Sequence, residues 1–287
     1  MLCEPELTSP HLPNSPFRSP SCCTLGASPP DLDMPATTAT HPTEASGTAS
    51  TLVLVPGLMC DHTVWDPVLP HLHAAFPGLQ FIVADHGPSD SLGGMADRIL
   101  AAAPEHFALA GHSMGARVAL EVVRRAPQRV TRIALLDTGH LPLPEGEAGQ
   151  AEAAKRHALL DVARAEGTRA MGQLWVQGMV HPARLQDTPL MDAILGMFAR
   201  KSADTFAAQI RALLARPDAS PVLQSLRIPT LVGSGRQDSW SPVAQHEAMH
   251  QLAPGSVLEV IEDAGHMAPM ERPAEMAAML GRWLEQL

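Results

Sequence analysis

The sequence predicts an α/β fold: a doubly wound, mostly parallel sheet of about six strands with a helical cap insertion. Two observations lead to this prediction. Short, uniformly apolar runs alternate with helical patterns from residue 51 onward, and one long interval, residues 141–216, has only helical patterns. Uniformly apolar strands are typical of sheets covered by helices on both faces, and the alternation favours parallel strands joined by right-handed crossovers.

Runs rich in branched residues mark the expected strands. These are Thr51–Val55, Leu79–Ala84, Phe107–Ala110, Val130–Leu136, Thr230–Gly233 and Val257–Ile261. Helical patterns between them lie around Val64–His73, Met95–Ala103, Met114–Arg125, Pro242–Leu252 and Pro273–Leu284. The last is the clearest helix, because Pro273 suits the first helical position and apolar residues follow it at helical spacing.

The chain is expected to contain a tail, a core in two segments and a cap. Residues 1–50 are rich in Pro, Ser and Thr and hold too little apolar surface to offset ordering entropy, so we expect a disordered tail. Residues 51–140 and 217–287 form the expected core, and residues 141–216 the cap or lid. The cap helices are predicted around Ala151–Ala165, Arg169–Met179, Thr188–Lys201 and Ala203–Ala215.

Charge and cysteine content narrow the class of partner. Lys and Arg number 20 against 30 Asp and Glu, with no basic run, which argues against nucleic acid or an anionic membrane. Only Cys60 of the four cysteines lies in the predicted core, and neither a secretory signal nor a membrane span is apparent. We therefore expect a cytoplasmic monomer or homodimer that acts on a small molecule.

The segment Gly111-His112-Ser113-Met114-Gly115 joins an apolar strand to an apolar helix. This context predicts a sharp strand-to-helix turn that presents the Ser113 hydroxyl as a nucleophile, with glycines where side chains would clash. The alternative is a serine that only caps the helix. A capping box would place Glu or Gln three residues on, but Ala116 is found there, so the nucleophile is favoured.

A serine nucleophile needs a base and a group that orients the base. His266 follows the last strand and Asp238 follows the strand Thr230–Gly233, so both are expected at the same sheet edge as Ser113. The order Ser113, Asp238, His266 is the one that accompanies a nucleophile elbow. Asp137, after Val130–Leu136, is the alternative orienting residue, although a structural role is more usual there.

The transition state also needs backbone donors for a developing oxyanion. Met114, directly after the nucleophile, is expected to supply one N–H group. The second is expected from Leu58 in the segment VPGLMCDHTVW, where Gly57 permits an unusual turn. The alternative is an ordinary Pro-Gly turn.

These motifs together resemble the α/β-hydrolase family over nearly all of residues 51–287. They are PGLMCDHTVW, GHSMG, the helical insertion, GRQD and AGHMAPMERP, in that order. The resemblance implies a doubly wound sheet with a cap and a catalytic triad of Ser113, Asp238 and His266. The chain departs from the family in having Pro56-Gly57 where His-Gly is frequent, and in lacking candidates for the family's first two strands.

The leading functional prediction is a serine hydrolase that cleaves small, largely apolar carboxylic esters, including lactones, through an acyl-enzyme. Carbon–carbon bond hydrolases, enol-lactonases and cofactor-free haloperoxidases resemble it in using the same triad. Candidate pocket residues are apolar, although core packing explains the cap residues among them equally well. They are Met59, Trp65, Trp175, Met179, Met197, Phe198, Trp240 and Met267.

Two alternatives belong to other classes. A metal site would have to use pairs such as His71 and His73, but residues two apart on a helix point away from each other. A non-catalytic ligand-binding module on the same fold usually lacks a member of the triad, and none is missing here. We therefore expect an enzyme with no metal and no cofactor.

Overall fold

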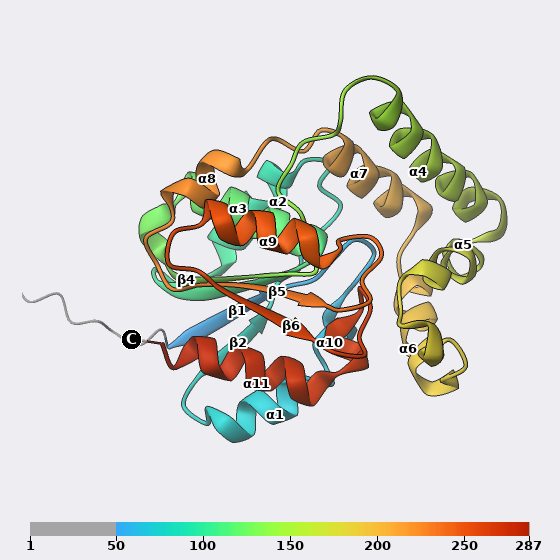
Figure 1. Ribbon diagram of the computed structural model, residues 1–287. Coiled ribbons are helices and arrows are strands. Elements are labelled where there is room, and N and C mark those ends of the chain that lie inside the picture. Colours follow the sequence, from blue (N-terminus) through green and yellow to red (C-terminus); the bar gives the residue numbers. More distant parts are fainter. Residues whose placement is uncertain (1–49, 287) are drawn as a thin grey trace, which may run out of the picture. The chain divides into compact units, whose positions relative to one another are not determined.

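The computed structural model describes residues 50–286, which form a parallel sheet covered by helices, with a group of helices at one end (Figure 1). The strands are β1 (Thr51–Val55), β2 (Gln80–Val83), β3 (Phe107–His112), β4 (Val130–Leu136), β5 (Thr230–Gly235) and β6 (Val257–Ile261). The helices of the core are α1 (Leu69–Ala75), α2 (Leu92–Ala102), α3 (Met114–Arg125), α8 (Ser220–Ser225), α9 (Val243–Leu252), α10 (Ala268–Glu271) and α11 (Pro273–Leu284). Those of the cap are α4 (Gly146–Glu166), α5 (Thr168–Trp175), α6 (Thr188–Ala199) and α7 (Ala203–Leu214).

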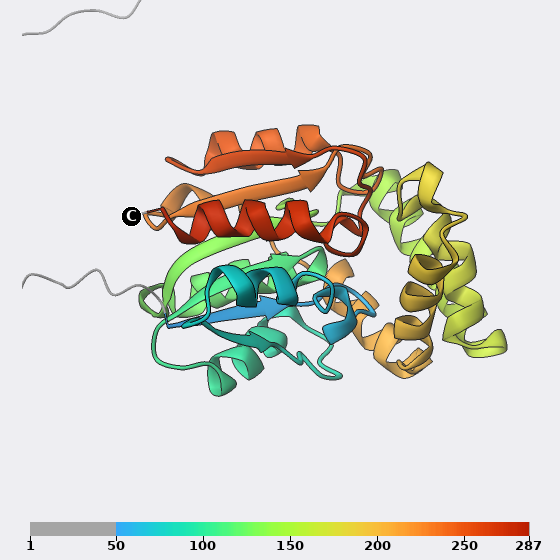
Figure 2. The same cartoon turned by 90° about the horizontal axis from the view of Figure 1, so that it is seen from below.

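The sheet has six strands in the order β2-β1-β3-β4-β5-β6, and every neighbouring pair is parallel. Strands β1 and β3 lie in its middle and are buried at every residue, which explains their uniformly apolar sequences. Helices α1 and α11 cover one face, and α2, α3, α8 and α9 cover the other (Figures 1 and 2). The predicted doubly wound, six-stranded fold is confirmed.

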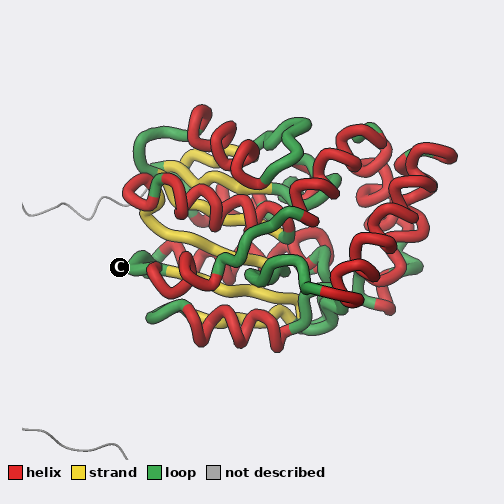
Figure 3. The backbone as a smooth tube through the Cα atoms, turned by 90° about the horizontal axis from the view of Figure 1, so that it is seen from above, coloured by secondary structure: helices red, strands yellow, loops and turns green. Residues whose placement is uncertain are grey.

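The cap is inserted between β4 and β5 and lies at the carboxyl ends of the strands, toward which the arrows point in Figure 1. Figure 3 shows the same group of helices beside one end of the sheet. The strongest ion pair between the cap and the core is bidentate: the guanidinium of Arg200, just after α6, donates to both carboxylate oxygens of Asp61 at 2.8 and 3.0 Å. A bidentate pair of this kind fixes geometry as well as charge. The cap therefore covers the edge of the sheet at which α/β proteins bind ligands.

Most predicted elements agree with the structure, and β1, β4, β6, α3 and α11 have the predicted bounds. Helices α8 and α10 were not predicted, because each is short and contains a proline. The predicted disordered tail lies outside the described residues, apart from Ser50. No helix within residues 50–286 combines the length and the apolarity that crossing a bilayer requires.

Candidate active site

Ser113 occupies a strained turn between β3 and α3. Its φ of 55° and ψ of −121° fall in a region that side-chain-bearing residues rarely adopt. Its side chain makes no capping hydrogen bond to α3, so the simple helix-cap interpretation is excluded. The backbone is held by two bonds: Ser113 N–H donates to Leu136 O at 2.8 Å, and Thr138 Oγ1 donates to Ser113 O at 2.9 Å.

The glycines on either side of Ser113 are required by close approach of the backbone. A Cβ at Gly115 would lie 2.2 Å from the carbonyl oxygen of Val55, and one at Gly111 would lie 2.5 Å from the backbone of Ala116. Real Cβ atoms do not approach backbone so closely, because packing at these distances is strongly repulsive. The GHSMG segment therefore folds as the predicted tight turn, with the Ser113 side chain left free.

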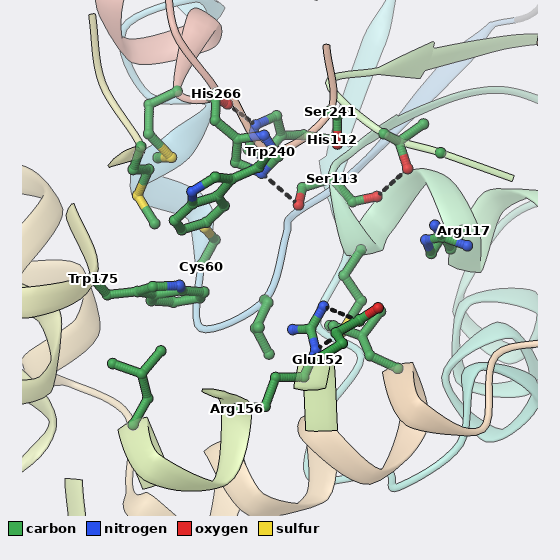
Figure 4. A pocket seen from close by; sticks show the side chains of 18 of the residues that line it. Cys60, His112, Ser113, Arg117, Glu152, Arg156, Trp175, Trp240, Ser241 and His266 are labelled. Carbon is green, nitrogen blue, oxygen red and sulfur yellow. Dashed lines mark hydrogen bonds and ion pairs between the residues drawn. The ribbon is translucent and has the colours of Figure 1, made fainter. Parts of the chain in front are cut away.

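Ser113, His266 and Asp238 lie together at the carboxyl edge of the sheet, on loops that follow β3, β6 and β5. His266 Nε2 is 2.8 Å from Ser113 Oγ, and His266 Nδ1 is 2.8 Å from Asp238 Oδ2. Asp238 is buried, and its other oxygen accepts the backbone N–H groups of Trp240 and Ser241 at 2.8 and 2.9 Å. The three side chains that the sequence analysis selected thus form one hydrogen-bonded chain (Figure 4).

The surroundings of Asp238 favour its ionised form. Burial opposes ionisation, but the charge and hydrogen bond of His266 and the two backbone N–H groups outweigh it and keep the pKa of Asp238 below its ordinary value. Asp238 is therefore a carboxylate at neutral pH and accepts from His266 Nδ1–H. This leaves Nε2 of the neutral ring as the acceptor that faces the Ser113 hydroxyl.

A second carboxyl group, Asp137, is buried near Asp238, but its pKa is shifted in the opposite direction. Burial, and then the charge of Asp238, raise the pKa of Asp137 well above its ordinary value. One of its oxygens accepts Gly235 N–H at 2.8 Å, and no hydrogen bond from residues 50–286 reaches the other. His266 is bonded to Asp238 and not to Asp137, so Asp137 is not the group that orients the base.

The loop that carries His266 is anchored by three further residues. His112 Nε2–H donates to the carbonyl oxygen of His266 at 2.7 Å, and burial followed by the charge of His266 lowers the pKa of His112 to about 3, so its ring stays neutral. From the cap, the carbonyl oxygen of Met179 accepts His266 N–H at 2.7 Å. The carboxylate of Glu271 accepts the N–H groups of Gly265 and His181, which joins the same loop to the cap.

The segment after β1 presents a backbone donor beside Ser113. Met59 has a positive φ of 60°, so the unusual turn is at Met59 and not at Gly57 as expected. Gly57 is required instead by space, since a Cβ there would lie 3.1 Å from Ser113 Cβ. Met59 N–H donates to Gln209 Oε1 of α7 at 2.8 Å, whereas the N–H of Leu58 has no acceptor within residues 50–286.

A cavity of about 620 Å³ opens beside the Ser113 hydroxyl and is lined by both the core and the cap. Leu58 and Met114, the two expected oxyanion donors, both line it. Its apolar wall includes Trp175 and Trp240, whose rings stack with centroids 5.1 Å apart, and Trp240 lies 5.0 Å from the ring of His266. The apolar wall lies directly against the base, and it extends to Met179, Phe206 and Met267.

Four of the residues predicted for the pocket do not line this cavity: Met59, Trp65, Met197 and Phe198. Each is fully buried. Trp65 contacts His112 edge-on, and Phe198 supports Trp175 from behind, with ring centroids 5.4 Å apart. These side chains pack the core beneath the cavity wall, as the alternative interpretation for the cap residues allowed.

The cavity also has a charged wall that the sequence analysis did not predict. It consists of Arg117 on α3, Glu152, Lys155 and Arg156 on α4, and Arg216 after α7. The three elements that carry these residues are far apart in the sequence and meet because the cap packs against α3. No group of three or more metal-binding side chains is found within residues 50–286, and the pairs considered above stay pairs.

The fold and the site described above agree with a match to a known protein family. A model of the α/β-hydrolase fold matches residues 50–273, which is most of the chain, and the protein belongs to the α/β-hydrolase family.

The relatives of known type within the family are distant. The chain is 25% identical over 240 residues to the pimeloyl-[acyl-carrier protein] methyl ester esterase of Aromatoleum aromaticum, which covers 80% of this chain and 96% of that one. It is 26% identical over 265 residues to the biotin biosynthesis bifunctional protein BioHC of Teredinibacter turnerae, covering 86% of this chain but only 46% of that protein. A thermophilic esterase from Thermogutta terrifontis has the same fold, with a TM-score of 0.71, 24% identity and coverage of 83% and 90%.

Proposed function

We propose that this protein is a serine hydrolase that cleaves carboxylic esters through an acyl-enzyme. The observation that carries the proposal is the hydrogen-bonded chain Ser113–His266–Asp238, with both links at 2.8 Å, beside a cavity that admits a small molecule. The strained backbone of Ser113 supports it, because such strain is retained where a side chain must be presented to a substrate.

In the proposed reaction, Ser113 Oγ attacks the ester carbonyl while His266 Nε2 takes the hydroxyl proton. The oxyanion that forms accepts the backbone N–H groups of Leu58 and Met114. His266 then returns the proton to the departing alkoxide, which leaves as the alcohol, and Ser113 remains acylated. Water, deprotonated by His266, attacks the acyl carbonyl and releases the acid, so that the serine hydroxyl is restored.

Esters are favoured among the substrates of such a triad because the chain is similar over most of its length to a methyl ester esterase. Carbon–carbon bond hydrolases, enol-lactonases and cofactor-free haloperoxidases with the same triad are the alternatives. A further alternative is a ligand-binding module without activity. The alternative enzymes share the fold and the triad, so substrate specificity has to separate them from an esterase, whereas a ligand-binding module would show no turnover.

Pre-steady-state hydrolysis of p-nitrophenyl acetate and butyrate tests the proposal. We expect a burst of nitrophenol equal to the enzyme concentration, followed by slower turnover, because the acyl-enzyme accumulates before water attacks it. Ser113→Ala should show neither phase. A β-diketone and an enol lactone serve as competing substrates. Turnover of the β-diketone without turnover of any ester would contradict the proposal, as would binding of esters without hydrolysis.

A further inference from the structure

The charged wall of the cavity is mostly cationic. Arg117, Lys155, Arg156 and Arg216 carry positive charge there, against the single carboxylate of Glu152. The chain as a whole has a net charge of −10, and these are four of its 20 basic residues. A concentration of cations inside a cavity of an acidic protein attracts anions to that cavity, because low-dielectric walls focus the field.

Glu152 is shared between two guanidinium groups. Both Nη atoms of Arg216 donate to it at 2.8 Å, and Arg156 donates through Nε and Nη2 at 3.0 and 2.8 Å. These contacts lower the pKa of Glu152 to about 2 in spite of its burial, so it is ionised at neutral pH. The single negative charge of Glu152 is thus outweighed by the charges of Arg156 and Arg216. Arg117 and Lys155 add two further positive charges to the wall.

Arg117 lies one helical turn after Ser113 on α3 and forms no ion pair with a carboxylate of residues 50–286. Its Nη1 donates to the carbonyl oxygen of Leu141 at 3.0 Å, and Arg216 Nε donates to the same oxygen at 3.2 Å. Two guanidinium groups therefore converge on one neutral acceptor. Burial and the charge of Arg216 lower the pKa of Arg117 to about 9, so it remains a cation at pH 7.

The cavity leaves room for an anion beside this guanidinium. Gly139 lines the cavity, and a Cβ there would lie 3.1 Å from Arg117 Nη2 and 2.7 Å from Gln245 Oε1. The φ of Gly139 is not in the left-handed region, so its backbone conformation does not require a glycine. A methyl group at this position would press on the ends of the Arg117 and Gln245 side chains.

The position of Ser113 relative to the two walls is shown in Figure 4. Trp175 and Trp240 lie on one side of the Ser113 hydroxyl, and Arg117 lies on the other. A substrate with its carbonyl at Ser113 would therefore place one end against the indole rings and the other beside Arg117. Burying a charge is favourable only when it is paired, so an ionised end would pair with this cation.

We propose that the cationic wall is a subsite for a carboxylate of the substrate, and that the preferred substrates are half-esters of dicarboxylic acids. Arg117 binds the free carboxylate, and the alcohol part of the ester lies against Trp175 and Trp240. This assignment rests on the proposed ester hydrolysis. It modifies the expectation of largely apolar substrates, which holds for the aromatic wall alone.

A matched pair of substrates tests the subsite. Methyl hydrogen glutarate and methyl 5-methylhexanoate have the same chain length and nearly the same shape, but only the first carries a carboxylate. The wild-type kcat/KM for methyl hydrogen glutarate should exceed that for the neutral ester by about 10-fold or more, the effect of one charge-assisted hydrogen bond. The preference should fall as ionic strength rises.

Arg117→Met removes the charge but keeps most of the apolar stem. It should bring the ratio of the two kcat/KM values to about one, with the loss for methyl hydrogen glutarate mainly in KM. Gly139→Ala should weaken the preference by crowding the same guanidinium. Arg164→Met is the control, because Arg164 is an exposed residue of α4 whose contact is the surface carboxylate of Asp161.

The outcomes separate this inference from the proposed function. A wild-type enzyme that prefers the neutral ester, or a preference that survives Arg117→Met, overturns the carboxylate subsite and leaves ester hydrolysis standing. If the wild-type enzyme hydrolyses neither substrate, the result counts against ester hydrolysis itself. Competitive inhibition by phenyl phosphate without inhibition by glutarate would also overturn the assignment, since the anion bound would then be a phosphate.

Discussion

Met59 donates its backbone N–H to the side-chain oxygen of Gln209, 150 residues further along the chain, at 2.8 Å. This bond joins helix α7 of the cap to the segment that carries Leu58. Gln209 is fully buried, and Met59 has the strained φ of 60°. We infer that Gln209 is a positioning residue, which holds the strained turn next to Leu58, the expected oxyanion donor.

Replacing Gln209 tests this positioning role. Gln209→Met should lower kcat about 10-fold with little change in KM, because a misplaced oxyanion donor is felt mainly in the transition state. Direct removal of such a donor costs more, about 10²–10³-fold. Gln209→Glu keeps an acceptor oxygen and should restore most of the activity. Gln251→Met, on the exposed side of α9, is the control, and an equal loss in it would contradict the role.

Asp238 and Asp137 should respond differently to the same substitution. Asp238→Asn should lower kcat about 10³–10⁴-fold, because an amide nitrogen facing Nδ1 imposes the wrong tautomer on His266. Asp137→Asn should leave kcat within a few-fold, because Asp137 does not bond to the histidine. Steady-state kinetics of the two variants on one ester measures the contrast, and comparable losses would contradict it.

The stability of Asp137→Asn should depend on pH in a defined direction. The pKa of Asp137 is raised in the folded state, so folding must keep a proton that the unfolded chain releases above a pH of about 3.8. The contribution of Asp137 to wild-type stability therefore declines as pH rises above that value, and the Asn variant lacks this contribution. Urea unfolding should show Asp137→Asn to be the more stable protein at pH 7, with a smaller difference near pH 4. A difference that does not vary with pH would be the contrary result.

The ion pair between Arg200 and Asp61 should stabilise the folded protein except in acid. Burial raises the pKa of Asp61, but hydrogen bonds from Arg200 and Thr63 outweigh this effect. They lower the pKa to about 2, against an ordinary value of 3.8. The contribution is thus complete above pH 3.8 and is lost as pH falls toward 2. Arg200→Met should cost about 1 kcal/mol at pH 7, a figure reduced for solvent screening because Arg200 is half exposed.

The check is the difference in unfolding free energy between wild type and Arg200→Met, measured from pH 7 down to pH 3. This difference should shrink below pH 4. Arg169→Met breaks an exposed pair with Asp192 inside the cap and should cost little at any pH. A constant difference for Arg200→Met across the range would show that the variant acts through packing rather than through charge.

The fold and the hydrogen-bonded group Ser113–His266–Asp238 were predictable because local sequence carries the positions of their residues. Uniformly apolar runs mark buried parallel strands, and residues that follow such strands meet at one edge of the sheet. Ser113 directly follows β3, and Asp238 and His266 lie in the loops after β5 and β6, so all three reach the same edge of the sheet. The glycines around Ser113 add a requirement for close approach that the sequence already displays.

The walls of the cavity were less predictable, because they depend on how the cap packs against the core. Arg117 and Glu152 belong to separate helices, and nothing in either helix alone indicates that both face one cavity. Similarly, the sequence does not show whether an apolar residue such as Phe198 or Trp65 lines a cavity or packs behind its wall. The hydrogen bond from Met59 N–H to Gln209 likewise joins two segments far apart in the sequence, and neither segment alone indicates the contact.

Covalent labelling with a fluorophosphonate tests the central claim, that Ser113 is an activated nucleophile. Mass spectrometry of the intact wild-type protein should show one adduct, and peptide mapping should place it on Ser113. The Ser113→Ala variant should remain unlabelled, and Asp238→Asn should label far more slowly. An unlabelled wild-type protein that also fails to hydrolyse p-nitrophenyl esters, or an adduct that persists in Ser113→Ala, would contradict the account.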